Sequence, residues 1–357
     1  MTAFYILIAI LIFGFLIFIH EFGHFITAKL SGVRVNEFSI NMGPKLFGWK
    51  RGETQYSFRL LPIGGYCAME GEDRDTGDPR SFVGAAWWKR LIILCAGSFM
   101  NLLTGFVVMA ILFGFFYQMP ATAKITSFME GNVVEAQGLR EGDVLYALNG
   151  RRIYMKSDFD MLESRLASDH CDLTVLRDGE KVLLENFDLT RKEITDSEGR
   201  TGKYLGMYFS ETQQKTFGTV LKTAGWQCID FTRIVWYGLT DLFTGKAGLK
   251  DMGGVVSVVD AMVQGGEAQQ SLSDGVLYVL YIGAFIAVNL AVINMMPIPA
   301  LDGGRVLFLL INTLFTAITG KKINPKYEGY IHAAAMVLLL GLMAVLLVKD
   351  VLMIARR

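Results

Sequence analysis

The residues with the clearest capacity for chemistry lie near the start of the chain, in the run His20-Glu21-Phe22-Gly23-His24. On a helix, residues four positions apart lie on one face, so both imidazoles can bind a single zinc ion. Glu21 lies beside them and can take a proton from a water molecule at the metal. The spacing therefore predicts a hydrolytic zinc site with Glu21 as the catalytic base.

A catalytic zinc site needs a third protein ligand and an open position for water. The best candidate is Asp302, which lies in the run NMMPIPALDGGR (294–305). It comes directly after 27 uncharged residues. Its prolines and glycines break a helix, and broken backbone at membrane depth is tolerated where it lines a cavity. An aspartate in an apolar segment needs a cation, and a metal held by two neutral histidines needs an anion. His170, in a charged segment, and His332, at the edge of an apolar run, are weaker candidates.

The composition indicates that this site lies in a membrane protein. The 357 residues are 52% hydrophobic and 19% charged, whereas soluble proteins carry about 25% charged residues. The 34 basic and 34 acidic residues cancel, which argues against a disordered chain and against a globally basic nucleic-acid binder. The four cysteines are scattered, so they predict neither a disulfide framework nor a thiolate metal site.

Four segments are apolar enough to cross a bilayer, which takes about 20 residues. They are 3–28, 90–117, 276–316 (long and interrupted) and 331–349. The first lacks the basic start and the small-residue cleavage site of a signal peptide, so we expect it to be retained. A charge at mid-bilayer costs roughly 2.5–3.5 kcal/mol, so His20, Glu21 and His24 there indicate function rather than polar contacts between helices.

Between the second and third spans lies a charged, β-branched segment, 124–210, with hairpin signals at Asn149-Gly150 and Asp178-Gly179. We expect a small water-exposed domain there. Residues 217–244 alternate aromatic and charged residues, as in an amphipathic helix at the membrane interface; a helix packed on the soluble domain is the alternative. The chain then divides into a first membrane part (1–117), an extracytoplasmic domain (118–212), an interfacial helix with linker (213–274) and a second membrane part (275–357).

The distribution of charge predicts an orientation. Residues 29–90 hold 10 basic and 7 acidic residues, whereas 124–274 hold 17 basic and 23 acidic. The loop 319–330 is also basic. Because loops rich in Lys and Arg face the cytoplasm, segments 29–90 and 319–330 are predicted to be inside and the 124–274 segment outside. The basic C-terminal tail argues weakly for the opposite orientation.

Several motifs together resemble the site-2 protease family of intramembrane zinc metalloproteases, in particular its bacterial RseP-like branch with a single PDZ domain. HEFGH lies in the first span and NxxPxPxLDGG in a late one. LPIGGY (61–66) is similar to the branch's Gly-Gly-Tyr segment. AGSFMN (96–101) resembles its AGPxxN stretch and DMGGVV (251–256) its GPVG stretch, each without the proline. Residues 133–153 resemble a PDZ domain. The resemblance covers essentially the whole chain.

The resemblance implies four transmembrane α-helices, the third interrupted, with an inserted β-rich PDZ domain and a re-entrant β-hairpin. It implies that His20, His24 and Asp302 bind zinc and that Glu21 is the catalytic residue. Asn294 would contact substrate backbone, with a hydrogen bond between helices as the alternative. Gly64 and Gly65 would belong to the hairpin, on which unwound substrate can lie as an added strand; a plain cytoplasmic hairpin is the alternative.

The function implied is hydrolysis of peptide bonds within or near the transmembrane segments of single-span proteins, such as anti-sigma factors or remnant signal peptides. The expected location is the bacterial inner membrane, with the PDZ domain outside and the active site toward the cytoplasm. Membrane lipid is expected to surround the protein, and no nucleic acid is expected as a partner. One rival is a membrane zinc transporter, but segments 6–19 and 333–348 carry almost no polar residue for an ion path. A non-catalytic PDZ scaffold leaves Glu21 without a role. The oligomeric state stays open.

Overall fold

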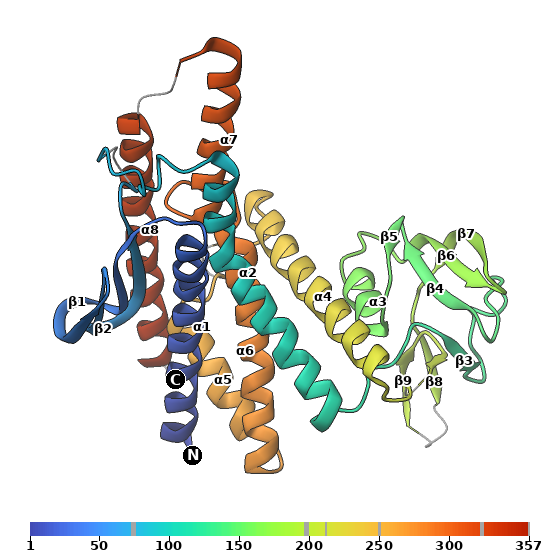
Figure 1. The fold of residues 1–357 in the computed structure, drawn as a ribbon. Coiled ribbons are helices and arrows are strands. Elements are labelled where there is room, and N and C mark those ends of the chain that lie inside the picture. The colour runs from blue at the N-terminus through green and yellow to red at the C-terminus, as the bar shows by residue number, and fades with distance from the viewer. Residues whose placement is uncertain (73–75, 196–199, 211–212, 249–250, 322–324, 356–357) are drawn as a thin grey trace. The chain divides into compact units, whose positions relative to one another are not determined.

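The computed structural model describes residues 1–72, 76–195, 200–210, 213–248, 251–321 and 325–355. The chain forms two compact units. The first comprises Met1–Met109 together with Phe231–Arg357, and the second comprises Ala110–Asp230. The first unit contains the long apolar helices and the second is rich in β-strands, as the labels in Figure 1 show.

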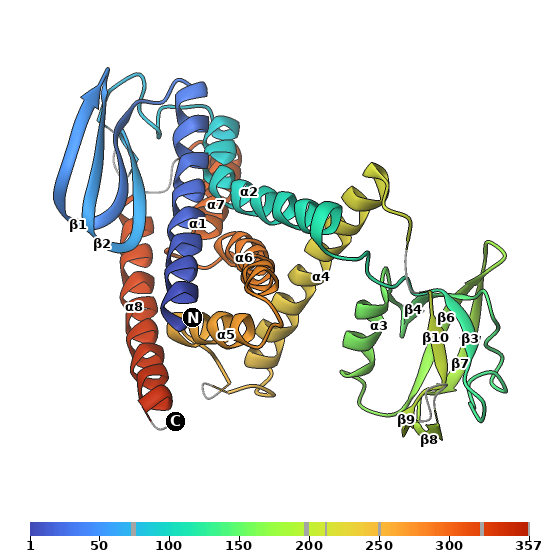
Figure 2. The same cartoon turned by 90° about the horizontal axis from the view of Figure 1, so that it is seen from below.

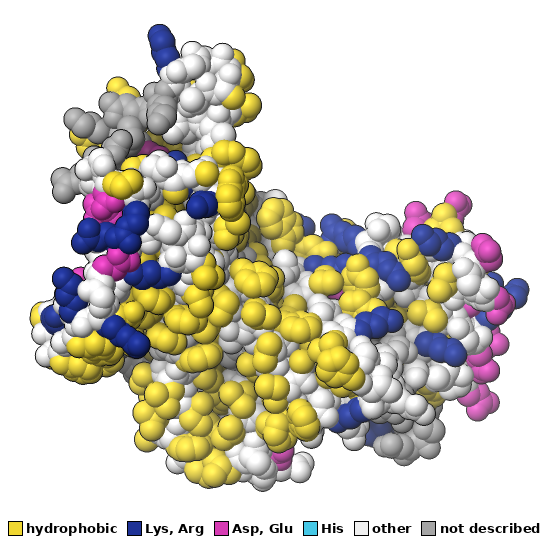
Figure 3. Space-filling view, in the orientation of Figure 1, with side chains coloured by type: hydrophobic (Ala, Val, Ile, Leu, Met, Phe, Trp, Pro, Cys, Tyr) yellow, Lys and Arg dark blue, Asp and Glu magenta, His cyan; other side chains and the backbone are white. Residues whose placement is uncertain are grey.

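Four helices among the described residues are long and apolar enough to cross a membrane. They are α1 (Thr2–Leu30), α2 (Trp87–Ile111) with its π-helical continuation η1 (Leu112–Phe116), α6 (Leu272–Asn294) and α8 (Pro325–Ala355). Large apolar side chains on α1, such as Leu7 and Leu11, are more than half exposed. Figure 3 shows hydrophobic side chains gathered over these helices. The multi-span membrane protein predicted from the sequence is confirmed.

The predicted third span, 276–316, is interrupted, as the sequence indicated, and its two parts are separate helices. Helix α6 alone has the length and apolarity of a span, and a separate helix α7 (Asp302–Thr319) follows after a break. Pro297 and Pro299 lie in the break and cannot continue a helix. A side chain at Gly303 or Gly304 would overlap the backbone of Met295–Pro299. The two glycines therefore allow the first turn of α7 to pack directly against the segment that follows α6.

Two apolar clusters hold the first unit together around α1. In the N-terminal half, Tyr5, Ala9 and Leu16 pack against α5 (Val255–Glu267) and α6. Near the other end, Ala28 belongs to a buried cluster that also contains Phe38 and Ile93. The HEFGH run follows the first cluster, and its Phe22 packs against the second, so the helix that carries it is anchored on both sides.

Strands β1 (Val35–Arg51) and β2 (Thr54–Met69) form an antiparallel sheet in which the chain doubles back. Residues 37–40 pair with 55–58 on one side and with 65–68 on the other. The described pairings therefore place the segment 65–69 at an edge of the sheet, and Figure 2 shows this sheet beside α1. Gly64 and Gly65, expected in a β-hairpin, lie in strand β2, whereas insertion of this sheet into the membrane stays a prediction.

The second unit has a four-stranded antiparallel sheet in the order β5-β4-β6-β7. Its strands are β4 (Val144–Leu148), β5 (Arg151–Arg152), β6 (His170–Arg177) and β7 (Glu180–Asp188). The predicted turns join β4 to β5 and β6 to β7, with Asn149, Gly150, Asp178 and Gly179 all at positive φ. Two shorter pairs complete the strands: β3 (Ile125–Phe128) with β10 (Met207–Phe209), and β8 (Lys192–Thr195) with β9 (Thr201–Tyr204).

Helix α3 (Lys156–Glu163) also belongs to this unit, and Phe159 on it is fully buried. The helix predicted over 217–244 is confirmed as α4 (Phe217–Phe243). Its Trp226 stacks on Tyr154 at 5.7 Å between ring centroids. The first half of α4 therefore packs within the β-rich unit. This agrees with the alternative prediction of a helix packed on the soluble domain. The predicted boundary at residue 212 lies outside the described residues.

Candidate metal centre

Three side chains from distant parts of the chain converge on one point. His20 and His24 come from α1, and Asp302 is the first residue of α7. Oδ2 of Asp302 lies 3.2 Å from Nε2 of His20 and 3.3 Å from Nε2 of His24. The two Nε2 atoms are 3.3 Å apart. Among the described residues, these three form the group of His, Cys, Asp and Glu side chains able to hold a metal ion.

The triangle has the dimensions that zinc requires. Ligands about 2.0–2.1 Å from a tetrahedral zinc ion are separated by roughly 3.3 Å. Oδ2 of Asp302 is buried and accepts no hydrogen bond from a described residue. Two imidazole nitrogens and a carboxylate oxygen at this spacing repel one another unless a cation lies between them. The donor set therefore fits zinc and leaves a fourth coordination position open.

The ring of His24 is oriented by helix α2. Its Nδ1 lies 2.8 Å from the carbonyl oxygen of Ile93, to which it can only donate. The proton is therefore on Nδ1, and Nε2 keeps the lone pair that a metal ion needs. Gly97 lies one turn further along α2, and a side chain there would overlap both histidine rings. Close approach of α2 thus depends on this glycine.

Glu21 faces away from α2, toward the edge of the β-sheet. A Cβ atom added at Gly65 would lie 3.2 Å from Cγ of Glu21 and 3.0 Å from the carbonyl oxygen of Ser39. The Glu21 carboxylate accepts no hydrogen bond from a residue in the described ranges. It is therefore available to a substrate or a water molecule at the sheet edge.

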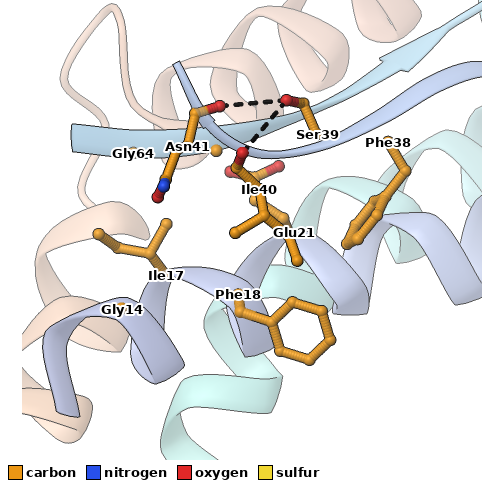
Figure 4. A pocket seen from close by; sticks show the side chains of 10 residues that line it. Gly14, Ile17, Phe18, Glu21, Phe38, Ser39, Ile40, Asn41 and Gly64 are labelled. Atoms are coloured by element: carbon orange, nitrogen blue, oxygen red, sulfur yellow. Dashed lines mark hydrogen bonds between the residues drawn. The ribbon is translucent and has the colours of Figure 1, made fainter. Parts of the chain in front are cut away.

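A small cavity of about 10 Å³, with room for about one water molecule, separates α1 from this edge. Figure 4 shows Glu21 rising from α1 toward the strands, with Ile17 and Phe18 below them. Ser39 donates its hydroxyl to the carbonyl oxygen of Asn41 at 3.1 Å. The cavity is lined by Gly14, Ile17, Phe18, Glu21, Phe38, Ser39, Ile40, Asn41, Gly64 and Gly65. Two of the predicted substrate-binding residues, Gly64 and Gly65, thus lie in the same cavity wall as the predicted catalytic residue.

The other residues considered in the sequence lie elsewhere. Asn294 is the last residue of α6 and is half-buried, and its side chain forms no hydrogen bond with a described residue. His332 accepts the backbone N–H of Ala300 at 2.8 Å, so it holds the chain just before Asp302. His170 is an exposed residue at the start of β6.

One contact near the site was not predicted. Arg305, in the first turn of α7, forms an ion pair with Glu72, which follows strand β2. The pair ties the helix that carries Asp302 to the segment after the sheet edge. Arg305 is the single cation between residues 276 and 316, which indicated that it would need an anionic partner. The sequence did not show that this partner is Glu72.

Two histidines and a carboxylate placed to hold a metal ion, with a glutamate beside them on a helix able to span a membrane, are typical of a membrane-embedded metallohydrolase. Residues 8–342 match the model of peptidase family M50. A provisionally named zinc metalloprotease of Clostridium acetobutylicum is 35% identical over 354 residues, covering 98% of each chain. A similarly named protein of Clostridium perfringens is 33% identical over 352 residues, covering 97% of this chain and 98% of its own.

The regulator of sigma-W protease RasP of Bacillus subtilis is 26% identical over 424 aligned positions, covering 96% of this chain and 97% of its own. The chain belongs to peptidase family M50, the site-2 protease family. It is an intramembrane zinc metalloprotease. The family, the enzyme class and the zinc cofactor expected from the sequence motifs are all confirmed.

Proposed function

We propose that His20, His24 and Asp302 bind the catalytic zinc and that Glu21 is the acid–base residue that cleaves peptide bonds in the membrane. The observation that carries the proposal is the triangle of ligand atoms 3.2–3.3 Å apart. Zinc, when bound at such a site, lowers the pKa of water and polarises the scissile carbonyl. Glu21 accepts the proton of the attacking water and then delivers it to the nitrogen of the leaving amine.

The sheet edge at Gly64 and Gly65 is the proposed binding site for the substrate backbone. The segment 65–69 pairs with residues 35–40 on one side, and among the described pairings its second side is left for an added strand. A helical substrate hides its carbonyls in its own hydrogen bonds and must unwind before it is cut. Strand addition beside Glu21 stabilises the unwound form without requiring a particular side-chain sequence. Asn294 is proposed to bind the same backbone, since an amide both donates and accepts.

The proposed substrates are single-span membrane proteins, such as anti-sigma factors or remnant signal peptides. The name of the Bacillus subtilis relative, a regulator of sigma-W, supports a role in regulated intramembrane proteolysis. We place the protein in the bacterial inner membrane with residues 118–212, proposed to be a PDZ domain, outside. His20 then lies roughly 28 Å along α1 at 1.5 Å per residue, toward the cytoplasmic side.

Exchange of Glu21 for Gln tests the catalytic assignment. The full chain is expressed with a tagged single-span substrate, and cleavage is followed together with the zinc content of the purified protein. Glu21→Gln is expected to abolish cleavage while zinc is retained. His20→Ala is the matched variant, expected to lose both.

Cleavage by Glu21→Gln would refute the catalytic role. Zinc retained at wild-type affinity in His20→Ala would refute the ligand set. Zinc transport that depends on these residues, with no cleavage, would favour the transporter instead.

A further inference from the structure

Helix α2 turns one face toward the histidine pair, through residues 93, 97 and 101. Positions four apart lie on the same side of a helix. The Ile93 carbonyl meets Nδ1 of His24, and Gly97 leaves room for both rings. Asn101 lies one turn further, with Nδ2 of its amide 3.4 Å from Nδ1 of His20. Each histidine therefore has a polar group of α2 behind it, on the side opposite Asp302.

His20 needs a hydrogen-bond acceptor at Nδ1, because its other nitrogen, Nε2, faces the other two ligands. Nε2 is the atom that lies 3.2 Å from Asp302 and 3.3 Å from His24. An imidazole that binds a metal through Nε2 carries its proton on Nδ1, and this N–H is a buried donor that needs an acceptor. His24 has such an acceptor in Ile93. His20 needs an equivalent one.

Asn101 supplies an acceptor in the right place. Its side chain is 1% exposed, and its Oδ1 is a buried atom that accepts no hydrogen bond from a described residue. The amide N–H group, a donor, faces Nδ1 of His20, while the acceptor oxygen next to it has no partner. A half-turn about Cβ–Cγ exchanges oxygen and nitrogen with almost no change in shape. The half-turn satisfies the Nδ1–H of His20 and the Asn101 oxygen at once.

We propose that Asn101 is a positioning residue for the zinc site: its Oδ1 accepts the Nδ1–H of His20 and holds Nε2 toward the metal. This inference rests on the proposed function, because it takes His20 as a ligand. It assigns a role to the last residue of the AGSFMN stretch. Helix α2 then orients both imidazoles, one through a backbone carbonyl and one through a side-chain amide.

A purely structural role for Asn101 makes a different prediction. A buried amide that only joins helices would affect folding when replaced, and zinc affinity of the folded protein would stay unchanged. The proposed role predicts that zinc affinity depends on an acceptor at position 101. Loss of an outer-shell partner of a metal-bound histidine typically weakens metal binding by about 10–100-fold.

The test measures the zinc dissociation constant of the full chain in detergent by competition with a chromogenic chelator. Asn101→Leu, of similar size but without an acceptor, is expected to bind zinc about 10–100-fold more weakly. Asn101→Asp, which keeps an acceptor oxygen, is expected to restore most of the affinity. If the leucine variant does not fold, Asn101→Ala is expected to show the same loss.

Ser98 on the same helix provides the control. It is 3% exposed and its Oγ has no hydrogen-bond partner among the described residues, so Ser98→Ala removes a buried polar atom of α2 without touching His20. Its zinc affinity is expected to equal that of the wild type. The inference is wrong if Asn101→Leu and Asn101→Ala bind zinc as tightly as the wild type, or if Asn101→Asp is as weak as they are.

His20→Ala separates this result from the proposed function. If it loses zinc while the Asn101 variants keep wild-type affinity, the ligand set stands and only the inference about Asn101 fails. If His20→Ala keeps zinc at wild-type affinity, the proposed ligand set fails and the Asn101 inference fails with it.

Discussion

Nε2 of His20 lies 3.2 Å from Oδ2 of Asp302, although the two residues belong to the first helix and to a helix near the C-terminus. Apolar packing on both sides of the HEFGH run and the glycine-lined break before Asp302 bring them together. The site therefore depends on tertiary structure of the whole first unit. A carboxylate at this position supplies the negative charge that two neutral imidazoles lack.

Asp302→Asn tests that charge. The amide has nearly the same shape but is neutral and a weaker ligand for zinc. We expect zinc affinity to fall by more than the roughly 10–100-fold seen for outer-shell partners, and cleavage to be lost at ordinary zinc concentrations. Asp274→Asn, an exposed residue in the first turn of α6, is the control and should bind zinc normally. Equal zinc affinity in Asp302→Asn and wild type would contradict the assignment.

Removal of the metal should be reversible. The ligand triangle comes from helices packed on both sides by apolar clusters, so we expect the fold of the first unit to persist without zinc. A chelator should therefore abolish cleavage, and added zinc should restore it, while the helical circular dichroism signal stays constant. Loss of helix content on chelation would show instead that the metal is needed for folding.

Gly65→Ala tests the sheet edge beside Glu21, the proposed catalytic residue. The new Cβ would lie 3.2 Å from Cγ of Glu21, so the carboxylate or the strand must move. Misplacement of a catalytic group by about 1 Å can cost about 100-fold in rate, and a shift of a few tenths of an ångström relieves this contact, so we expect a fall in kcat of about a few-fold with zinc content unchanged. Gly341→Ala in α8 is the control, since its Cβ meets no atom within 4 Å. Loss of zinc in Gly65→Ala would mean that the sheet supports the metal site and not the catalytic residue.

Much of the proposed site could be predicted because its signals are local. The four-residue spacing of His20 and His24 fixes their common face on any helix. Asp302 was identifiable from charge balance, as the carboxylate that follows a long uncharged run. Neither argument needed knowledge of the tertiary fold.

The contacts that orient the two histidines could not be predicted, because they depend on which face of α2 packs against α1. The carbonyl of Ile93 is a backbone atom, and every residue has one, so its role leaves no mark on the sequence. Asn101 was visible within a motif, but its partner depends on the rotation of α2 about its axis. The doubled sheet that pairs residues 37–40 on both sides also went unpredicted, since strand composition does not specify register.

His332→Phe tests the support of the backbone that precedes Asp302. The ring keeps similar bulk but cannot accept the N–H of Ala300, so a part-buried donor loses its partner. Such a loss costs about 1–3 kcal/mol. We expect a lower Tm in detergent and weaker zinc binding, because the segment leading to Asp302 is less well fixed. His332→Gln, which can still accept, should recover part of both, and unchanged values in His332→Phe would show that this hydrogen bond does not position Asp302.

The ion pair between Asp143 and Arg177 should determine the stability of the second unit. Asp143 is 1% exposed and accepts from the Arg177 guanidinium at 2.7 Å. The pair joins the start of β4 to the end of β6 in the central sheet. Asp143→Ala leaves the Arg177 guanidinium and the backbone N–H of Arg140 without this acceptor, and a part-buried donor that loses its partner costs about 1–3 kcal/mol. Asp143→Ala should therefore unfold or loosen this unit.

Hydrogen exchange on the full chain measures the effect by region. In Asp143→Ala, the amides of β4, β6 and β7 should exchange much faster, whereas those of α1 around the HEFGH run should not change. Asp160→Ala is the matched control, because its pair with Lys156 at 2.5 Å is exposed. Surface pairs contribute about 0–1 kcal/mol, so protection should stay near that of the wild type. Since His20, His24 and Asp302 all belong to the first unit, Asp143→Ala should also keep its zinc. A loss of zinc there would mean that the two units do not fold independently.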